Sequence, residues 1–229
     1  MDLIENELKD PIKHWYYRHK FWFVRHSKLW KLSADCSLVD IGAGSALFSK
    51  ELLRQGVVNN VVAVDTGYQN DLAKLNGILY CRSTNYSGFS HFLLTDVLEH
   101  IEDDKTFLTH IVTEAEIDSA FLITVPAMMS LWSGHDIYLK HYKRYTRSEL
   151  ITLVEKSGLK VHSARYTYST VFPVAFIQRK IQGKKVINSH LKEDGFLLSS
   201  LLRIALLPDR WLGFIPFGVS IFLEATKNE

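Results

Sequence analysis

Short apolar runs alternate with amphipathic stretches from residue 37 to residue 170 of this 229-residue chain. The runs that predict β-strands are 37–42, 60–65, 77–81, 91–96, 119–126 and 159–170. Helices are predicted at 45–55, at 103–115, and after a capping box that spans residues 146–149. Strands that are separated by helices indicate a mostly parallel sheet with helices packed on its faces.

The two ends of the chain complete this pattern. A last β-rich run at 218–227 is predicted to enter the sheet beside the 159–170 strand as an antiparallel strand. We therefore expect an α/β fold with a doubly wound, Rossmann-like, seven-stranded sheet in one domain that covers 1–229. Its expected parts are an N-terminal cap helix at 1–36, a core at 37–169, an apolar helical insertion at 170–213 and the last strand at 214–229.

The N-terminal segment is basic and aromatic. Residues 11–34 contain six lysines and arginines and no acidic residue, and three of the five tryptophans of the chain lie at positions 15, 22 and 30. The apolar positions do not fall on one narrow face, so we predict a helix that is covered on more than one side. Such a segment also suits an RNA-binding or membrane-surface module, which is one alternative function for the chain.

Charge and composition narrow the range of functions. The 27 lysines and arginines almost balance the 25 acidic residues, so DNA is not an expected partner. Two cysteines and no secretory signal indicate a cytoplasmic protein, and the apolar insertion allows contact with the inner face of a membrane. No apolar run reaches the roughly 20 residues that span a bilayer.

A glycine-containing turn follows the first predicted strand. Gly42 and Gly44 let backbone N–H groups approach a ligand, and the carboxylate of Asp40 can accept hydrogen bonds from an amino group. Leu47 stands where a dinucleotide site prefers a small residue, and Asp40 would repel a pyrophosphate, which disfavours a nicotinamide dehydrogenase. One strand later, Asp65 is placed to bind a ribose diol.

Four segments together resemble a known family: VDIGAGSA, VVAVD, LLTDVLEHIEDD and HDIYLKHYKRYTRSEL. From about residue 15 to its end the chain resembles the class I S-adenosylmethionine-dependent methyltransferases, in their small-molecule branch. The resemblance implies a Rossmann-like fold, methyl transfer and S-adenosyl-L-methionine as cofactor. Two departures are that Ala46 replaces the usual last glycine, and that no acidic residue ends the third strand, where many relatives bind the adenine amine.

The resemblance also implies a set of cofactor contacts. Asp40, Gly42, Ala43 and Gly44 would line the methionine moiety, Asp65 and Thr66 would hold the ribose, Arg82 and Ser83 would flank the adenine, and Thr95, Asp96 and His100 would close the pocket. From the N-terminal helix, Arg18 is expected to pair with the cofactor carboxylate.

The loop at 128–146 is the expected acceptor pocket, although an ordinary surface loop is the alternative. If the acceptor is a hydroxyl, a general base must take its proton, and the expected catalytic residues are His135, His141 and Asp96. No metal site is expected, because nothing further completes a ligand set with His135, Asp136 and His141.

The predicted function is methyl transfer by in-line displacement to a small-molecule, glycan or lipid-linked acceptor. A relative that binds the cofactor without turning over is a further alternative. The apolar insertion would form a lid, contact a second subunit or contact lipid, so the sequence does not decide between a monomer and a homodimer.

Overall fold

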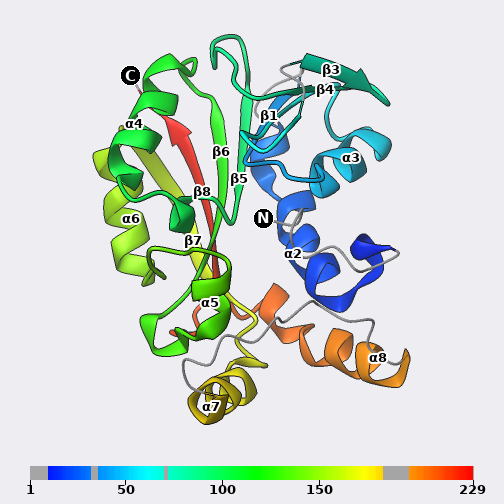
Figure 1. Cartoon of the computed structure of the whole chain (residues 1–229), viewed down its shortest axis with the longest axis vertical. Coiled ribbons are helices and arrows are strands. Elements are labelled where there is room, and N and C mark those ends of the chain that lie inside the picture. The colour runs from blue at the N-terminus through cyan, green and yellow to red at the C-terminus, as the bar shows by residue number, and fades with distance from the viewer. Residues whose placement is uncertain (1–9, 32–35, 70–71, 183–195, 229) are drawn as a thin grey trace.

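A computed structural model describes residues 10–31, 36–69, 72–182 and 196–228. Within these residues one sheet has the strand order β3-β4-β2-β1-β5-β6-β8-β7 (Figure 1). Its strands are β1 (Ser37–Ile41), β2 (Asn60–Val64), β3 (Leu72–Leu75), β4 (Ile78–Cys81), β5 (His91–Thr95), β6 (Ala120–Pro126), β7 (Leu159–Thr167) and β8 (Ser220–Lys227). All but β3 and β8 run parallel. The predicted doubly wound sheet with an antiparallel last strand is confirmed, and β8 lies between β6 and β7.

The sheet has an eighth strand that the apolar pattern did not predict. β3 pairs antiparallel with β4 at the edge of the sheet, through a two-residue turn at Asn76 and Gly77. Both turn residues have positive φ angles, of 51° and 81°, which is typical of the Asn-Gly hairpin turn. Because Leu72 and Leu75 of β3 are both exposed, the strand has no buried face to reveal it in the sequence.

Helices cover both faces of the sheet. Their bounds are η1 (Pro11–Lys13), α2 (Trp15–Arg25), η2 (Lys28–Lys31), α3 (Leu47–Arg54), η3 (Leu98–His100), α4 (Asp104–Glu114), η4 (Met129–Leu131), α5 (Gly134–Tyr138), α6 (Arg147–Lys156), α7 (Phe172–Gln182), α8 (Phe196–Ala205) and η5 (Pro208–Arg210). α4 and α6 bury Leu108 and Val154 on one face, while α2 and α3 bury Val24 and Leu52 on the other (Figure 1). The two apolar layers thus lie on opposite faces of the sheet.

Helix α2 packs on the same face of the sheet as α3 and is covered on several sides, as predicted. Phe21 stacks on Phe48 of α3 with ring centroids 5.9 Å apart, and Tyr16 stacks on Tyr168, which follows β7, at 5.1 Å. The Tyr168 hydroxyl also donates to the Tyr16 carbonyl at 2.7 Å. Most of the aromatic side chains of α2 therefore form core contacts, which argues against their use as a stacking surface for RNA.

Helices α7 and α8 lie between β7 and β8 along the chain and pack less tightly. Figure 1 shows both at the lower end of the molecule, together with α5, which follows the carboxyl end of β6. Both helices carry exposed apolar side chains: Val174, Ile177 and Ile181 on α7, and Leu197, Leu198, Leu201 and Ile204 on α8. No helix among the described residues has the length and apolar character needed to pass through a bilayer.

Candidate active site

Left-handed backbone is concentrated where the strands end. Asp96, Met128 and Tyr168 follow β5, β6 and β7 with φ angles of 55°, 60° and 59°, and Ala46 has φ 55° at the start of α3. Side chains with a Cβ disfavour this region, and such strain is found most often at functional sites. The carboxyl edge of the sheet is therefore the place to look for chemistry, as expected for an open parallel sheet.

A cleft opens at this edge between α2 and the ends of β1 and β5. Its lining residues are Tyr17, Lys20, Asp40, Gly42, Ala43, Leu47, Phe48, Thr95 and Asp96. Five of the residues expected at the cofactor are among them, namely Asp40, Gly42, Ala43, Thr95 and Asp96. Charged groups in the cleft are two carboxylates and one ammonium, which together suit a ligand with charges of both signs.

The turn after β1 is held tightly against the neighbouring strands. The backbone N–H groups of Gly42 and Ala43 donate to the Val64 carbonyl at 2.8 and 3.1 Å. A Cβ on Gly42 would lie 2.7 Å from Val97 Cγ2, and the residue has a φ of +66°, so only glycine fits there. Buried beneath the turn, the Asp40 carboxylate accepts a hydrogen bond from the Ser49 hydroxyl.

Asp65 lies beside the same turn at the end of β2. Its carboxylate accepts hydrogen bonds from the N–H groups of Gly44 and Gly67, at 2.9 and 2.8 Å. The other cofactor candidates in this part of the chain are Thr66, after β2, and Arg82 and Ser83, after β4. All three are exposed and follow neighbouring strands, because β2 pairs with β4.

Lys20 is a site residue that sequence reasoning missed. Its ammonium pairs with the Asp96 carboxylate and donates to the Tyr16 hydroxyl at 3.1 Å, and the Lys20 and Asp96 residues are only 4% and 6% exposed. Thr124 donates a further hydrogen bond to Asp96 at 3.0 Å. Arg18, the expected cation, is exposed on another side of α2 and does not line the cleft.

The ion pair fixes the charge of both groups. Burial alone would lower the pKa of Lys20, but the Asp96 carboxylate raises it above its ordinary value. Burial likewise opposes ionisation of Asp96, and the Lys20 ammonium outweighs it and lowers the pKa of that carboxyl. Asp96 is therefore a weak base at neutral pH, which favours a role in positioning.

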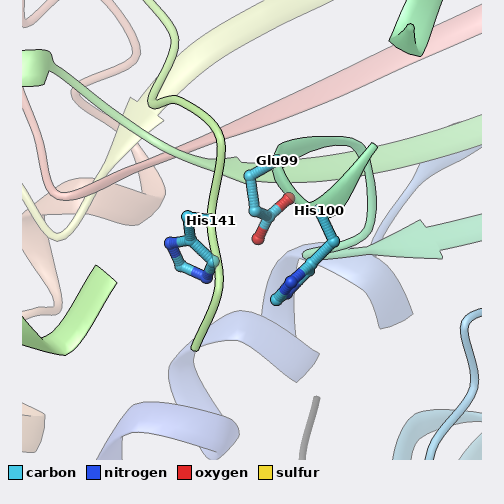
Figure 2. A group of neighbouring side chains, drawn as sticks. All are labelled: Glu99, His100 and His141. Atoms are coloured by element: carbon cyan, nitrogen blue, oxygen red, sulfur yellow. The ribbon is translucent and has the colours of Figure 1, made fainter. Parts of the chain in front are cut away.

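Three side chains meet beside this pair, as Figure 2 shows. Glu99 and His100 come from η3, and His141 comes from the loop after α5. The two imidazole rings meet edge to face with centroids 4.6 Å apart, and the Glu99 carboxyl group points between them. Burial and the neighbouring Asp96 raise the pKa of Glu99 well above its ordinary value, and burial and His141 lower the pKa of His100 to about 4.

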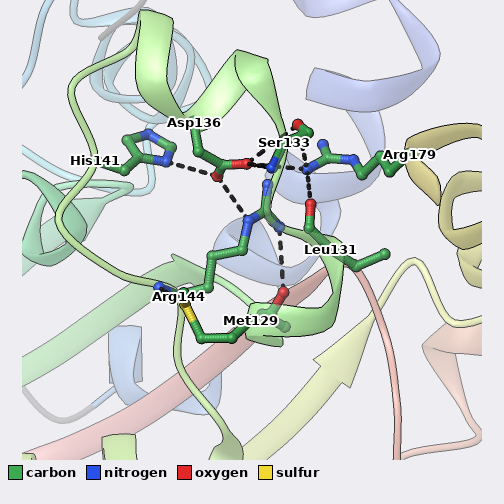
Figure 3. A network of polar contacts seen from close by, with 8 residues as sticks. Met129, Leu131, Ser133, Asp136, His141, Arg144 and Arg179 are labelled. Carbon is green, nitrogen blue, oxygen red and sulfur yellow. Dashed lines mark hydrogen bonds and ion pairs between the residues drawn. The ribbon is translucent and has the colours of Figure 1, made fainter. Parts of the chain in front are cut away.

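Asp136 is the centre of a polar network in the 128–146 loop (Figure 3). It accepts from Arg144 Nε at 2.6 Å, from the Ser133 N–H at 2.9 Å and from Arg179 of α7 at 3.3 Å, and it bonds His141 Nδ1 at 3.0 Å. Although burial opposes ionisation, His141 and Arg144 hold the pKa of Asp136 well below its ordinary value. Asp136 thus anchors the loop and α7.

Of the three residues that were expected in catalysis, two lie near each other and the third, His135, lies apart from them. Asp96 and His141 both lie at the carboxyl edge of the sheet, and the two groups interact electrostatically. His135 lies on α5, where burial and the Arg179 guanidinium lower its pKa to about 4. An imidazole with so low a pKa is a poor proton acceptor at neutral pH. Tyr142 and Lys143, between His141 and Arg144, are partly or fully exposed.

Residues 14–164 match the family described as "Methyltransferase domain". The chain belongs to this family. Its members use a methyl donor, and the cofactor of this methyltransferase is S-adenosylmethionine. The match ends within β7, so α7, α8 and β8 lie outside it.

Solved structures show the same fold at low identity. An S-adenosylmethionine-dependent methyltransferase from Archaeoglobus fulgidus is 15% identical, with 93% of this chain and 94% of that chain covered and a TM-score of 0.54. A Galdieria sulphuraria protein described as a sarcosine dimethylglycine methyltransferase is 11% identical, with 93% and 86% covered and a TM-score of 0.57. An O-methyltransferase family protein from Burkholderia thailandensis is 10% identical, with 93% and 57% covered and a TM-score of 0.57. None of the curated proteins compared with the chain matches it.

The charged groups of the cleft fit this cofactor. The methionine end of S-adenosylmethionine carries an ammonium, a carboxylate and a sulfonium, and the cleft offers the Asp40 and Asp96 carboxylates together with the Lys20 ammonium. Gly42 lines the cleft without a side chain that would obstruct it. The charged side chains of the cleft are thus complementary to the charges of S-adenosylmethionine.

Proposed function

We propose that this methyltransferase acts on a lipid-linked acceptor at a membrane surface. The observation that carries the proposal is the pair of exposed apolar faces on α7 and α8. Ile177 and Ile181 follow Val174 at intervals of three and four residues, and Leu201 and Ile204 follow Leu197 in the same way. Each helix therefore exposes one continuous apolar stripe, and apolar patches of this kind mark interaction sites.

Charge supports a lipid surface as the occupant of these faces. Residues 170–213 contain seven lysines and arginines and three acidic residues, whereas the whole chain has a net charge of only +2. Lys180 is exposed in the last turn of α7, and the exposed Trp211 and Phe214 follow α8. Apolar stripes with basic flanks and exposed aromatic rings are typical of helices that lie in the headgroup region of anionic membranes.

Cofactor binding is assigned to residues of the cleft. Bound S-adenosylmethionine supplies an activated methyl group on its sulfonium. In this proposal Asp40 accepts hydrogen bonds from the amino group, and Lys20, held by Asp96, faces the carboxylate. Asp65 and Thr66 at the end of β2 hold the ribose, and Arg82 and Ser83 after β4 flank the adenine.

The acceptor is assigned to the other side of Asp96. There Glu99, His100 and His141 gather their polar atoms between η3 and the loop after α5 (Figure 2). Methyl transfer mainly requires alignment of the acceptor with the methyl group, so a polar acceptor atom held at this cluster would react with little covalent help from the protein. The lipid part of the acceptor would extend toward α7 and α8.

Vesicle binding tests the membrane part of the proposal. The double variant Ile177→Glu/Leu201→Glu should no longer co-sediment with vesicles that contain phosphatidylglycerol, while the unchanged protein does. Each lost apolar insertion is worth about 2 kcal/mol, so partitioning should fall by at least roughly a hundredfold. Leu72→Glu is the matched control, because Leu72 is 67% exposed but lies on the edge strand β3 at the opposite end of the molecule.

Three results decide the matter. The proposal is supported if only the double variant loses vesicle binding and if labelled methyl from S-adenosylmethionine enters the organic phase of a lipid extract with the unchanged protein. It is rejected if the unchanged protein does not co-sediment with anionic vesicles. Rejection also follows if the double variant converts a homodimer to a monomer in light scattering, since the two stripes would then face a second copy.

A further inference from the structure

Glu99, His100 and His141 have the geometry of a metal-ligand set. One ligand atom from each residue lies within 4.8 Å of the others, so small side-chain movements would bring all three donors onto a single ion. Figure 2 shows the carboxyl group of Glu99 between the two imidazoles, all three directed toward a common point. Two imidazoles and one carboxylate form the donor set of catalytic zinc sites and related sites that keep open positions.

The cluster is buried without the hydrogen bonds that buried polar groups require. Glu99 is fully buried, and neither of its carboxyl oxygens has a hydrogen-bond partner among the described residues. The Nε2 atoms of His100 and His141 are likewise buried and unpartnered within that part of the chain. Since a buried polar atom without a hydrogen-bond partner is destabilising, several of them in one place point to a missing ligand.

The outer nitrogen atom of His141 has a partner that is typical of metal sites. His141 Nδ1 lies 3.0 Å from the Asp136 carboxylate. A ligating histidine usually donates its second N–H group to a carboxylate or a carbonyl, which fixes the ring and leaves the other nitrogen free to bind the ion. Asp136 is itself held by Arg144 and Arg179.

Within the described part of the chain, the cations nearest to Glu99 are already paired with other carboxylates. The Lys20 ammonium is bound to Asp96, and the Arg144 guanidinium is bound to Asp136. Lys143, on the same loop, is bound to Asp104 at 2.6 Å. The basic groups that the described residues bring near the cluster are thus already paired, and a divalent cation would supply the charge that Glu99 lacks.

We propose that Glu99, His100 and His141 bind one divalent transition-metal ion of the Zn²⁺ type next to the cofactor cleft. Three protein ligands leave at least one coordination position open, and an acceptor oxygen bound there would be polarised and held beside Asp96. This role rests on the proposed function, but the existence of the site does not. The sequence analysis expected no metal because it grouped His141 with His135 and Asp136. In the structure, Asp136 pairs with Arg144, and the residues that group with His141 are Glu99 and His100.

Metal titration of the full-length, chelator-treated protein tests the site without any enzyme assay. Calorimetry with Zn²⁺ should show one equivalent bound, and Co²⁺ should give the visible absorption of a low-coordinate ion with nitrogen ligands. Glu99→Gln and His141→Ala should each weaken Zn²⁺ binding by more than about a hundredfold. His110→Ala is the matched control, because His110 is exposed and contacts Glu114 at 3.5 Å away from the cluster.

Circular dichroism and S-adenosylhomocysteine binding show whether each variant is folded. The proposal holds if both cluster variants keep these properties and lose the metal, while His110→Ala retains it. It is overturned if the unchanged protein binds less than one equivalent, or if the folded cluster variants bind Zn²⁺ as well as the unchanged protein. If the protein binds the metal but does not methylate a lipid-linked acceptor, the proposed function is rejected and the metal site is still supported.

Discussion

Replacing Lys20 by methionine is expected to lower the free energy of unfolding by about 3–5 kcal/mol, as measured by urea denaturation. The Lys20 ammonium is the buried partner of Asp96, and methionine keeps the length of the side chain while removing the charge. Among the described residues, the Thr124 hydroxyl would then be the one side-chain group that donates to the buried Asp96. An uncompensated buried carboxylate costs far more than the pair itself contributes.

The matched control is Arg18→Met, two residues earlier on the same helix. Arg18 is exposed, so its loss should change stability by no more than about 0.5 kcal/mol. The double variant Lys20→Met/Asp96→Asn should recover part of the lost stability, because it removes both charges together. Equal effects of the Lys20 and Arg18 substitutions would show that the buried pair does not form in solution.

Asp136→Asn is the second substitution with a large expected effect, again about 3–5 kcal/mol of unfolding free energy. Asparagine keeps the shape of the side chain but leaves the guanidinium of Arg144, which is only 4% exposed, without its counter-charge. It also weakens the contact to Arg179, which joins α7 to the loop (Figure 3). Limited proteolysis should therefore cut near α7 faster in this variant than in the unchanged protein.

Glu155→Gln on the exposed side of α6 controls for the loss of one negative charge. It should leave the urea midpoint nearly unchanged, with an effect within about 0.5 kcal/mol. Adding Arg144→Met to Asp136→Asn should restore part of the stability if the unpaired guanidinium is the cause. If Asp136→Asn behaves like Glu155→Gln, the 128–146 loop does not depend on this network and is the ordinary surface loop that the sequence left open.

The fold was largely predictable from the sequence because each central strand has a dense apolar run. β6, for example, is buried at every position, and the 119–126 run already indicated it. β3 was missed because both of its leucines are exposed, so no buried face imposes a pattern on the sequence. Its turn residues, Asn76 and Gly77, were the available signal.

The candidate site was predicted where it depends on strand ends and missed where it depends on packing. Asp40 and Gly42 were expected from the turn after the first strand, and Asp96 from the family resemblance, and all three line the cleft. The rotation of α2 could not be inferred, because apolar residues lie on several of its sides. Arg18 and Lys20 are two positions apart and therefore point in very different directions on a helix.

The approach of His141 to Glu99 had no local signal in the sequence. The two residues belong to loops that follow β5 and β6, and they meet only because these strands are neighbours in the sheet. The Tyr142 N–H donates to the Glu99 carbonyl at 2.7 Å and holds the two loops together. Contacts of this kind depend on the exact path of the loops, which composition and periodicity do not determine.

Calorimetric titration with S-adenosylhomocysteine tests the central claim most directly, namely that the cleft between α2 and the ends of β1 and β5 binds the cofactor. We predict binding at one site per chain, and a clear loss of affinity in Asp40→Asn, whose carboxylate faces the cleft. Absence of binding to the folded, unchanged protein would contradict the account.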